Sequence, residues 1–205
     1  MGKGFQRALK RITDVVVSAV GLLVLSPLFL VVAAAIKLTS QGPVLFRQER
    51  VGKDGRISRI FKFRTMIQNA VNHPLGYHTN GHDPRVTPVG RFLRQYSLDE
   101  LPQFINILLG DMSLVGPRPT LAYQVEKYDD VQRRRLQVLP GVTGMAQVNG
   151  RNHLTWPQRI ERDVWYVDHW SYGLDLHILW HTVGVWLRRE GVDNEGIPDE
   201  ISQVS

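Results

Sequence analysis

The chain of 205 residues contains no cysteine. This absence excludes a disulfide framework, a zinc site built from thiolates and a cysteine nucleophile, and it agrees with a reducing compartment. Several motifs that carry chemistry are also missing. The sequence has no P-loop, no G-x-S-x-G turn, no H-E-x-x-H and no dinucleotide-binding glycine fingerprint. The enzyme classes that depend on these motifs are therefore not expected.

Charge of one sign is in excess: 25 lysines and arginines face 19 acidic residues, which gives a net charge of +6. This balance predicts an anionic partner, which is a nucleic acid, a phosphorylated metabolite or an acidic lipid. The length allows one domain with its own core and a small appendage. A hydrophobic share of 43% argues against both a disordered chain and a protein with many membrane spans.

The longest uncharged run is Val15–Ile36. A straight helix of this length would reach roughly 33 Å, enough to cross a bilayer core of about 30 Å, so a single span is the simplest interpretation. Ser26 and Pro27 interrupt the run. Pro27 cannot donate to the carbonyl of Leu23, so the pair predicts a kink, and the Ser26 hydroxyl is expected to provide a local hydrogen bond.

Both flanks of this run are cationic, and short cationic flanks stay on the cytoplasmic side. We therefore expect residues 1–40 to form a re-entrant membrane helix that enters one leaflet and returns, with both of its ends on the cytoplasmic face. Residues 41–205 are expected to form a membrane-associated catalytic domain. The flanking cations are Lys3, Arg7, Lys10, Arg11, Lys37, Arg47, Arg50, Lys53, Arg56 and Arg59.

The remaining pattern predicts an α+β fold that is mainly helical and contains one small β-hairpin. The expected strands are Val44–Gln48 and Ile57–Phe63, and the second alternates so that Ile57, Phe61 and Phe63 share a face. Loops are expected at Gln68–Arg85 and Pro140–Gly144. Helices are expected from Thr87 and from Thr155, which has capping-box spacing, and over Leu98–Leu109, Leu121–Val138 and Leu174–Glu190.

All five tryptophans lie in the late helices, at Trp156, Trp165, Trp170, Trp180 and Trp186. Tryptophan gathers at membrane interfaces because it is apolar at one end and polar at the other. Interfacial amphipathic helices are one interpretation, and ordinary core packing is the other. The sequence does not decide between them.

Asp99 and Glu100 are the strongest candidates for chemistry. Ser97 and Glu100 have the spacing of a capping box, which is a purely structural interpretation. It leaves Asp99 unexplained. Adjacent carboxylates repel unless a cation lies between them, and Mg²⁺ with phosphate oxygens is a common solution. Because Arg91 and Arg94 precede the pair, the segment is typical of a phosphoryl-transfer centre with metal ligands at Asp99 and Glu100.

Other basic residues are candidates for phosphate binding. Arg118 lies between Pro117 and Pro119, which fix the backbone on both sides, so its guanidinium is placed for bidentate binding. The structural alternative is a stiff turn with a solvated arginine. Lys62 and Arg64 share a face of the second strand, where a solvated edge and a phosphate site are both open interpretations.

Histidine clusters do not predict a metal site. His73, His78 and His82 share one loop, and His177 and His181 are four residues apart on a helix. Neither group has a supporting carboxylate at the usual spacing.

A series of motifs follows in order along nearly the whole chain: Lys10–Asp14, Ser26-Pro27, Phe61–Met66, Ser97–Gln103, Gly110–Ser113, Gly116–Pro119 and Pro140–Arg151. This series resembles the bacterial sugar transferases, the monotopic phosphoglycosyl transferases, in the minimal form of the undecaprenyl-phosphate bacillosamine-phosphate transferase type. The resemblance implies a position on the cytoplasmic face of the bacterial inner membrane.

The resemblance implies a reaction in which a UDP-sugar and undecaprenyl phosphate give undecaprenyl-diphospho-sugar and UMP, with Mg²⁺ as cofactor. This is the first membrane step of bacterial glycoconjugate synthesis. The resemblance also implies a ping-pong scheme. Asp99 takes the place of the nucleophile that forms a covalent phosphosugar, and Glu100 that of a metal ligand or proton carrier. The position of Arg94 suits binding of the lipid phosphate, and Ser26-Pro27 corresponds to the break of a re-entrant helix.

Further substrate-binding residues follow from the resemblance. Arg118, Thr143, Gln147 and Arg151 are expected to face the donor nucleotide or its diphosphate. Asp163, Tyr166 and Asp175 match a late pattern of the family without an assigned role. The resemblance transfers nothing onto the loop Gln68–Arg85.

Two other functions stay open on the residues alone. A lipid-phosphate phosphatase would form a similar phosphoenzyme and pass it to water. A membrane-anchored basic module would bind acidic lipid or nucleic acid, but it would have no use for the paired carboxylates, so nucleic acid is not an expected partner. A homodimer is left open.

Overall fold

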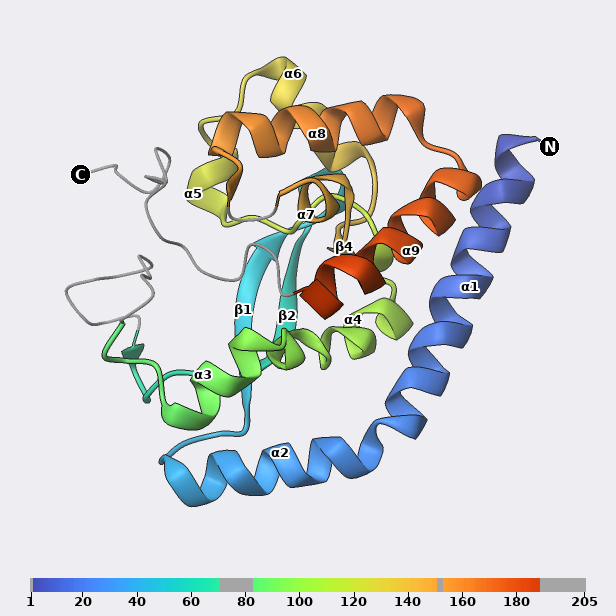
Figure 1. Cartoon of the computed structure of the whole chain (residues 1–205). Helices are drawn as coiled ribbons and strands as arrows, with labels where there is room; N and C mark the ends of the chain where they lie inside the picture. The colour runs from blue at the N-terminus through green and yellow to red at the C-terminus, as the bar shows by residue number, and fades with distance from the viewer. Residues whose placement is uncertain (1, 71–82, 151–152, 189–205) are drawn as a thin grey trace.

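The computed structural model describes residues 2–70, 83–150 and 153–188. Two helices, α1 (Lys3–Val24) and α2 (Ser26–Thr39), form an open L along two sides of the body that the other elements build (Figure 1). The pair is bent by 61° at its break. The Ser26 hydroxyl donates to the Leu23 carbonyl at 2.8 Å, so the kink and its hydrogen bond are confirmed.

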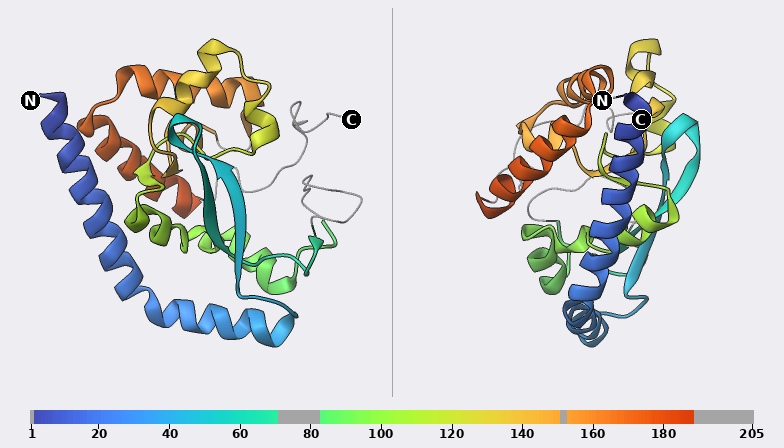
Figure 2. Two further views of the ribbon diagram at one scale, coloured as in Figure 1. Left: turned by 180° about the vertical axis from the view of Figure 1, so that it is seen from behind. Right: turned by 90° about the vertical axis from the view of Figure 1, so that its right-hand side faces the viewer.

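Within the described residues, no single helix is long and apolar enough to cross a membrane, whereas α1 and α2 meet that criterion as a bent pair. A bend of 61° is too small to lay α2 antiparallel beside α1. The chain turns at Pro27 but does not fold back on itself, and Figure 2 shows the same open arrangement from behind. Large apolar side chains on the pair are exposed, among them Leu23 at 76% and Leu38 at 87%.

Helix α1 is held to the body by polar contacts. The buried Asp14 carboxylate accepts a hydrogen bond from the Leu114 N–H at 2.9 Å. The Lys10 ammonium donates to the Val115 carbonyl at 2.9 Å and pairs with Asp175 at 2.8 Å. These bonds pair side chains of α1 with buried backbone groups of residues 114 and 115, so α1 is part of the packed fold.

The β-hairpin pairs β1 (Leu45–Val51) with β2 (Ile57–Phe63) in antiparallel register, across a turn that contains η1 (Lys53–Gly55). The second strand matches its predicted bounds, and the first extends beyond its predicted end at Gln48. The predicted inner face is wrong at Ile57, which is 62% exposed, while Ile60 on the other face is 2% exposed. Ile60 packs into the main core with Ile107 of α4 (Gln103–Leu109), because this helix lies against β2.

A second sheet pairs β3 (Ser113–Val115) with β4 (Gly141–Thr143) in parallel. Part of the predicted loop Pro140–Gly144 is therefore a strand. The other described elements are α3 (Pro88–Gln95), η3 (Leu98–Glu100), α5 (Ala122–Val125), α6 (Asp130–Arg133), η4 (Arg134–Gln137), α7 (Met145–Val148), α8 (Trp156–His169) and α9 (Tyr172–Arg188).

Two helix starts are confirmed by their caps. The Thr87 hydroxyl accepts from the Gly90 N–H at 2.9 Å, with Pro88 in the first turn of α3. Thr155 and Gln158 form the expected capping box of α8.

Two predicted helices are broken. The segment Leu98–Leu109 divides into η3 and α4 because Pro102 has no N–H and begins a new helix. The segment Leu121–Val138 divides into α5, α6 and η4. The Asp129 side chain accepts from the Gln132 N–H at 2.8 Å and caps a fresh helix start at Asp130. The predicted helix Leu174–Glu190 corresponds to α9, and its last two residues lie outside the described ranges.

The tryptophans divide between the two interpretations. Trp170 packs against the main core, and Trp156 packs against a second cluster around Tyr128 and Ile160. Trp165, Trp180 and Trp186 are 41%, 78% and 47% exposed. An interfacial position stays a prediction for these three.

Candidate active site

Asp99 and Glu100 lie in η3, between α3 and α4. Ser97 adopts a left-handed backbone conformation with φ of 54°, and its side chain makes no capping hydrogen bond to η3. The capping-box interpretation of Ser97 and Glu100 is therefore wrong. Glu100 is directed to two cations from distant parts of the chain.

Glu100 binds Lys62 and Arg118. Lys62 Nζ of β2 lies 2.6 Å from Glu100 Oε1. The Arg118 guanidinium donates to Oε1 at 2.6 Å and to Oε2 at 3.2 Å, which is a bidentate contact. Burial raises the pKa of Glu100, but the charges of Arg118 and Lys62 outweigh it and hold the pKa well below its usual range. Glu100 is therefore an ionised carboxylate with both oxygens occupied.

Asp99 has the opposite character. Burial raises its pKa to about 6; Lys62 opposes this shift and the adjacent Glu100 charge adds to it. Within the described ranges, no residue donates a hydrogen bond to the Asp99 carboxylate. A desolvated carboxylate that lacks donors but lies among cations is reactive toward an electrophilic phosphorus.

Arg94 reaches the same region from α3. Its Nε donates to the Thr65 hydroxyl at 2.9 Å, and burial lowers its pKa while Asp99 raises it. The Thr65 carbonyl in turn accepts from the Thr87 N–H at 3.0 Å. The start of α3 is thereby fixed to the chain that leaves β2, so Arg94 lies in the electrostatic field of Asp99.

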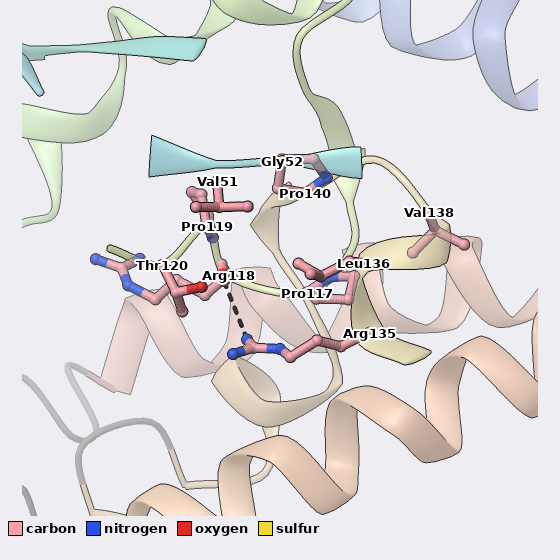
Figure 3. A pocket seen from close by; sticks show the side chains of 10 residues that line it. All are labelled: Val51, Gly52, Pro117, Arg118, Pro119, Thr120, Arg135, Leu136, Val138 and Pro140. Atoms are coloured by element: carbon pink, nitrogen blue, oxygen red, sulfur yellow. Dashed lines mark hydrogen bonds between the residues drawn. The ribbon is translucent and has the colours of Figure 1, made fainter. Parts of the chain in front are cut away.

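The segment that carries Arg118 is tightly held. All four carbonyls from Pro117 to Thr120 accept hydrogen bonds: Pro117 from Gly141 N at 2.9 Å, Arg118 from Arg135 Nη2 at 3.0 Å, Pro119 from Arg50 Nη1 at 3.4 Å and Thr120 from Val51 N at 2.8 Å. Figure 3 shows this segment at the wall of a small pocket. The sequence prediction of a rigid, pre-positioned arginine agrees with this backbone.

Several predicted substrate-binding residues are engaged elsewhere. Arg64 donates through Nη2 to the Ser40 carbonyl at 2.9 Å and to its hydroxyl at 3.0 Å, at the end of α2. The Thr143 hydroxyl lies 2.8 Å from that of Thr182. The buried amide of Gln147 has no hydrogen-bond partner in the part of the chain that is described. Arg151 lies outside the described residues.

The late acidic residues lie in two buried networks. Asp163 pairs with Arg135, which contacts the Arg118 carbonyl. Asp175 accepts from the Tyr166 hydroxyl at 2.6 Å and pairs with Lys10. No described contact links the second network to Asp99, and a role of these residues in substrate binding stays a prediction.

Sequence reasoning missed three supporting residues. Asn106 is fully buried, and its amide accepts from Phe61 N at 2.9 Å and donates to the Arg59 carbonyl at 2.8 Å, which fixes α4 on the edge of β2. A polar residue inside an apolar helix was the available signal. Thr65 and Arg135 had no comparable local signal, because their partners are distant in sequence.

The site offers Mg²⁺ a limited donor set. Within residues 2–70, 83–150 and 153–188 no cluster of three or more histidine or acidic residues could hold a metal, and Glu100 is saturated by its cations. Of the two acids, Asp99 has carboxylate oxygens that accept no hydrogen bond from the described residues. Because Mg²⁺ is often held by one or two carboxylates plus substrate phosphates and water, the residues fit an ion that arrives with a diphosphate. The histidines at 73, 78 and 82 lie outside the described residues.

The candidate site is thus a pair of adjacent carboxylates set among two arginines and a lysine, an arrangement typical of sites that bind phosphate groups. The chain belongs to the bacterial sugar transferase family, whose model matches residues 5–189.

Curated relatives cover most of the chain. It is 45% identical to the UDP-glucose:undecaprenyl-phosphate glucose-1-phosphate transferase of Klebsiella pneumoniae, over 88% of this chain and 40% of the relative. It is 40% identical to the undecaprenyl-phosphate galactose phosphotransferase of Salmonella typhimurium, over 93% of this chain and 43% of the relative. The uncharacterized sugar transferase EpsL of Bacillus subtilis is 43% identical, with 90% of both chains aligned. The chain thus spans less than half of the first two relatives and most of the third.

Proposed function

We propose that the protein is a phosphoglycosyl transferase that moves a phosphosugar from a UDP-sugar to undecaprenyl phosphate. The products are undecaprenyl-diphospho-sugar and UMP. The observation that carries the proposal is the environment of the Asp99 carboxylate. It is desolvated and lies near Lys62, Arg94 and Arg118, and Glu100 forms salt bridges with Lys62 and Arg118. The Klebsiella and Salmonella relatives, which are named as undecaprenyl-phosphate sugar-phosphate transferases, support the substrate class.

In the first half-reaction an Asp99 oxygen attacks the phosphorus that bears the sugar. A new O–P bond forms, the bond to the bridging oxygen breaks, and UMP leaves with that oxygen and its charge. The attacking group carries no proton, so the step needs Asp99 ionised. The surrounding cations stabilise the charge that develops on the phosphoryl oxygens.

In the second half-reaction an oxygen of the lipid phosphate attacks the same phosphorus. The bond to Asp99 breaks and returns the carboxylate, which closes a ping-pong cycle. Arg94 is the cation proposed to bind this lipid phosphate, because within the described part of the chain its guanidinium is held by a hydrogen bond from Nε to Thr65 and its other two nitrogens are left for a ligand. Mg²⁺, held by Asp99 and the donor diphosphate, would neutralise phosphate charge.

The bent pair α1 and α2 is the proposed membrane element. Its exposed apolar side chains and cationic flanks favour a re-entrant arrangement with both ends on the cytoplasmic face. This arrangement brings the site to the surface where a lipid phosphate meets a soluble nucleotide.

The test is a panel of UDP-sugars incubated with the purified chain, undecaprenyl phosphate and Mg²⁺, with UMP release as the readout. One donor is expected to release UMP and to yield a lipid-linked diphosphosugar. Release of inorganic phosphate from undecaprenyl phosphate, without dependence on any UDP-sugar, would favour a phosphatase and contradict the proposal.

A further inference from the structure

Arg135 is a buried arginine that the proposed half-reactions do not use. It lies in η4, and its side chain is 3% exposed. Nη1 donates to the Tyr128 hydroxyl at 2.5 Å, while Nη2 donates to the Asp163 carboxylate and, at 3.0 Å, to the Arg118 carbonyl. The last of these bonds is drawn in Figure 3. One guanidinium therefore joins α8, the segment before α6 and the segment that carries Arg118.

The carbonyl that Arg135 holds belongs to the residue whose guanidinium binds Glu100. Pro117 and Pro119 restrict the backbone on both sides of Arg118. With this backbone restricted, the position of the Arg118 carbonyl also fixes the direction of its Cα–Cβ bond, and so the start of its side chain. A shift of the carbonyl would move the guanidinium away from the two Glu100 oxygens, which it meets at 2.6 and 3.2 Å.

Stability alone does not account for the buried pair. Asp163 and Arg135 are 1% and 3% exposed, so both are largely removed from water. Replacement of such a pair by apolar residues of similar volume is often neutral or stabilising. The rings of Tyr128 and Trp156 lie 5.6 and 5.8 Å from the Arg135 guanidinium carbon, so an apolar side chain would find suitable neighbours. What an apolar pair cannot supply is a donor for the Arg118 carbonyl.

We propose that Arg135 and Asp163 are positioning residues: Asp163 orients Arg135, and Arg135 holds Arg118 in place for Glu100. Neither touches the substrate. The inference rests on the proposed function, because its effect is read in phosphosugar transfer, and it gives Asp163 a role that the sequence left unassigned.

The experiment replaces the pair by Arg135→Met together with Asp163→Leu. The midpoint of thermal unfolding is expected to change little, while kcat/KM for UMP release falls by about 10- to 100-fold, the usual effect of losing a supporting contact. The fall is expected mainly in kcat. Arg135→Lys keeps the charge beside Asp163 but lacks the planar guanidinium that donates to several acceptors at once. It is therefore expected to fold and to lose activity to a similar extent. The matched control is Arg134→Met with Asp168→Asn, an exposed pair between the same two helices, which is expected to keep wild-type kinetics.

A double-mutant cycle separates positioning from general disruption. In an Arg118→Met background, the same double replacement is expected to cost less than about twofold further activity. An equal loss in both backgrounds, or full activity of the apolar pair, would overturn the proposal.

Hydrogen–deuterium exchange reads the positioning without substrate. The backbone amides of Arg118, Thr120 and Leu121 are expected to exchange faster in the apolar pair than in wild type, and unchanged exchange would contradict the inference even if transfer is observed. Absence of UMP release from the wild-type chain would instead contradict the proposed function, so the two failures are distinguishable.

Discussion

Asp99 and Glu100 are neighbours in sequence and differ in almost every physical respect. Glu100 meets two cations and keeps its charge at low pH, whereas Asp99 is half-buried without a donor among the described residues. Environments that separate the pKa values of two carboxyl groups allow them different tasks. Here the saturated acid organises Lys62 and Arg118, and the unsaturated one is left to react.

The pKa of Asp99 predicts the pH dependence of the first half-reaction. Since the ionised form attacks, the single-turnover rate of UMP release is expected to fall about tenfold per pH unit below about pH 6. Glu100→Gln removes a neighbouring negative charge, so it should move this acid limb to lower pH. A rapid-quench series from about pH 4.5 to about pH 8 measures both. A rate that stays constant down to about pH 4.5 would contradict the assignment.

The same pKa predicts a stability effect of Asp99→Asn. An aspartate with a usual pKa of 3.8 that titrates near 6 in the folded state binds its proton more tightly when folded. Ionisation therefore costs folding stability as pH rises through this interval, and the cost is constant above about pH 6. Asp99→Asn is expected to raise the free energy of unfolding by about 1 to 3 kcal/mol at neutral pH and to have little effect below about pH 4. Denaturant unfolding at both pH values measures it, and an equal effect at both would be inconsistent with the pKa.

At the scale of the elements, local signals predicted where structure begins. Thr87 and Thr155 cap helices as expected, β2 has its predicted bounds, and the chain bends at Ser26-Pro27 between α1 and α2. These features depend on residues within one turn of each other, so the sequence contains their cause. The buried face of β2 depends on α4, which packs from far along the chain, and there the prediction failed.

The candidate site was also predicted only in part. The Asp99-Glu100 pair and the stiff segment around Arg118 were found from residue types and spacing. The partners of Glu100 were not, because Lys62 and Arg118 come from other elements and meet it only in the folded chain. Ser97 and Glu100 have the spacing of a capping box, but in the folded chain the Glu100 carboxylate pairs with Lys62 and Arg118 instead.

Gly90 shows how closely two elements approach at the site. A Cβ at this position in α3 would lie 2.0 Å from the Thr65 carbonyl oxygen, which is backbone and cannot give way easily. Gly90→Ala is therefore expected to destabilise the fold by about 1 to 3 kcal/mol and to disturb the contact of Arg94 with Thr65. The measurement is the midpoint of thermal unfolding in detergent.

Gly184 in α9 provides the matched control. A Cβ there meets only the flexible end of Arg188 at 3.7 Å, so Gly184→Ala is expected to be neutral or to stabilise by up to about 1 kcal/mol. Equal effects of the two substitutions would show that the close approach at Gly90 is unimportant.

At the scale of the whole molecule, the bent pair α1 and α2 frames the body, and Lys10 and Asp14 bind α1 to β3. The pair is therefore part of the unit that carries Arg118, since β3 leads directly into that segment. Under the proposed membrane position of the pair, this continuity would couple insertion to the geometry of the site.

The re-entrant arrangement predicts that both ends of the pair lie on one side of the membrane. Because the chain has no cysteine, Gly2→Cys and Gln41→Cys provide single labels. In intact cells neither is expected to react with an impermeant thiol reagent, and both should react after permeabilisation. Labelling of one but not the other in intact cells would establish a span. Pro27→Ala is expected to straighten the pair and to produce that unequal pattern.

The most direct test of the account is the mass of the protein after incubation with its UDP-sugar in the absence of lipid phosphate. The wild-type chain is expected to gain the mass of one phosphosugar at Asp99, release one equivalent of UMP and lose the added mass when undecaprenyl phosphate is supplied. Asp99→Asn is expected to gain none, although it folds and binds the donor. A phosphosugar adduct that forms on the Asp99→Asn chain would contradict the assignment of Asp99 as the nucleophile.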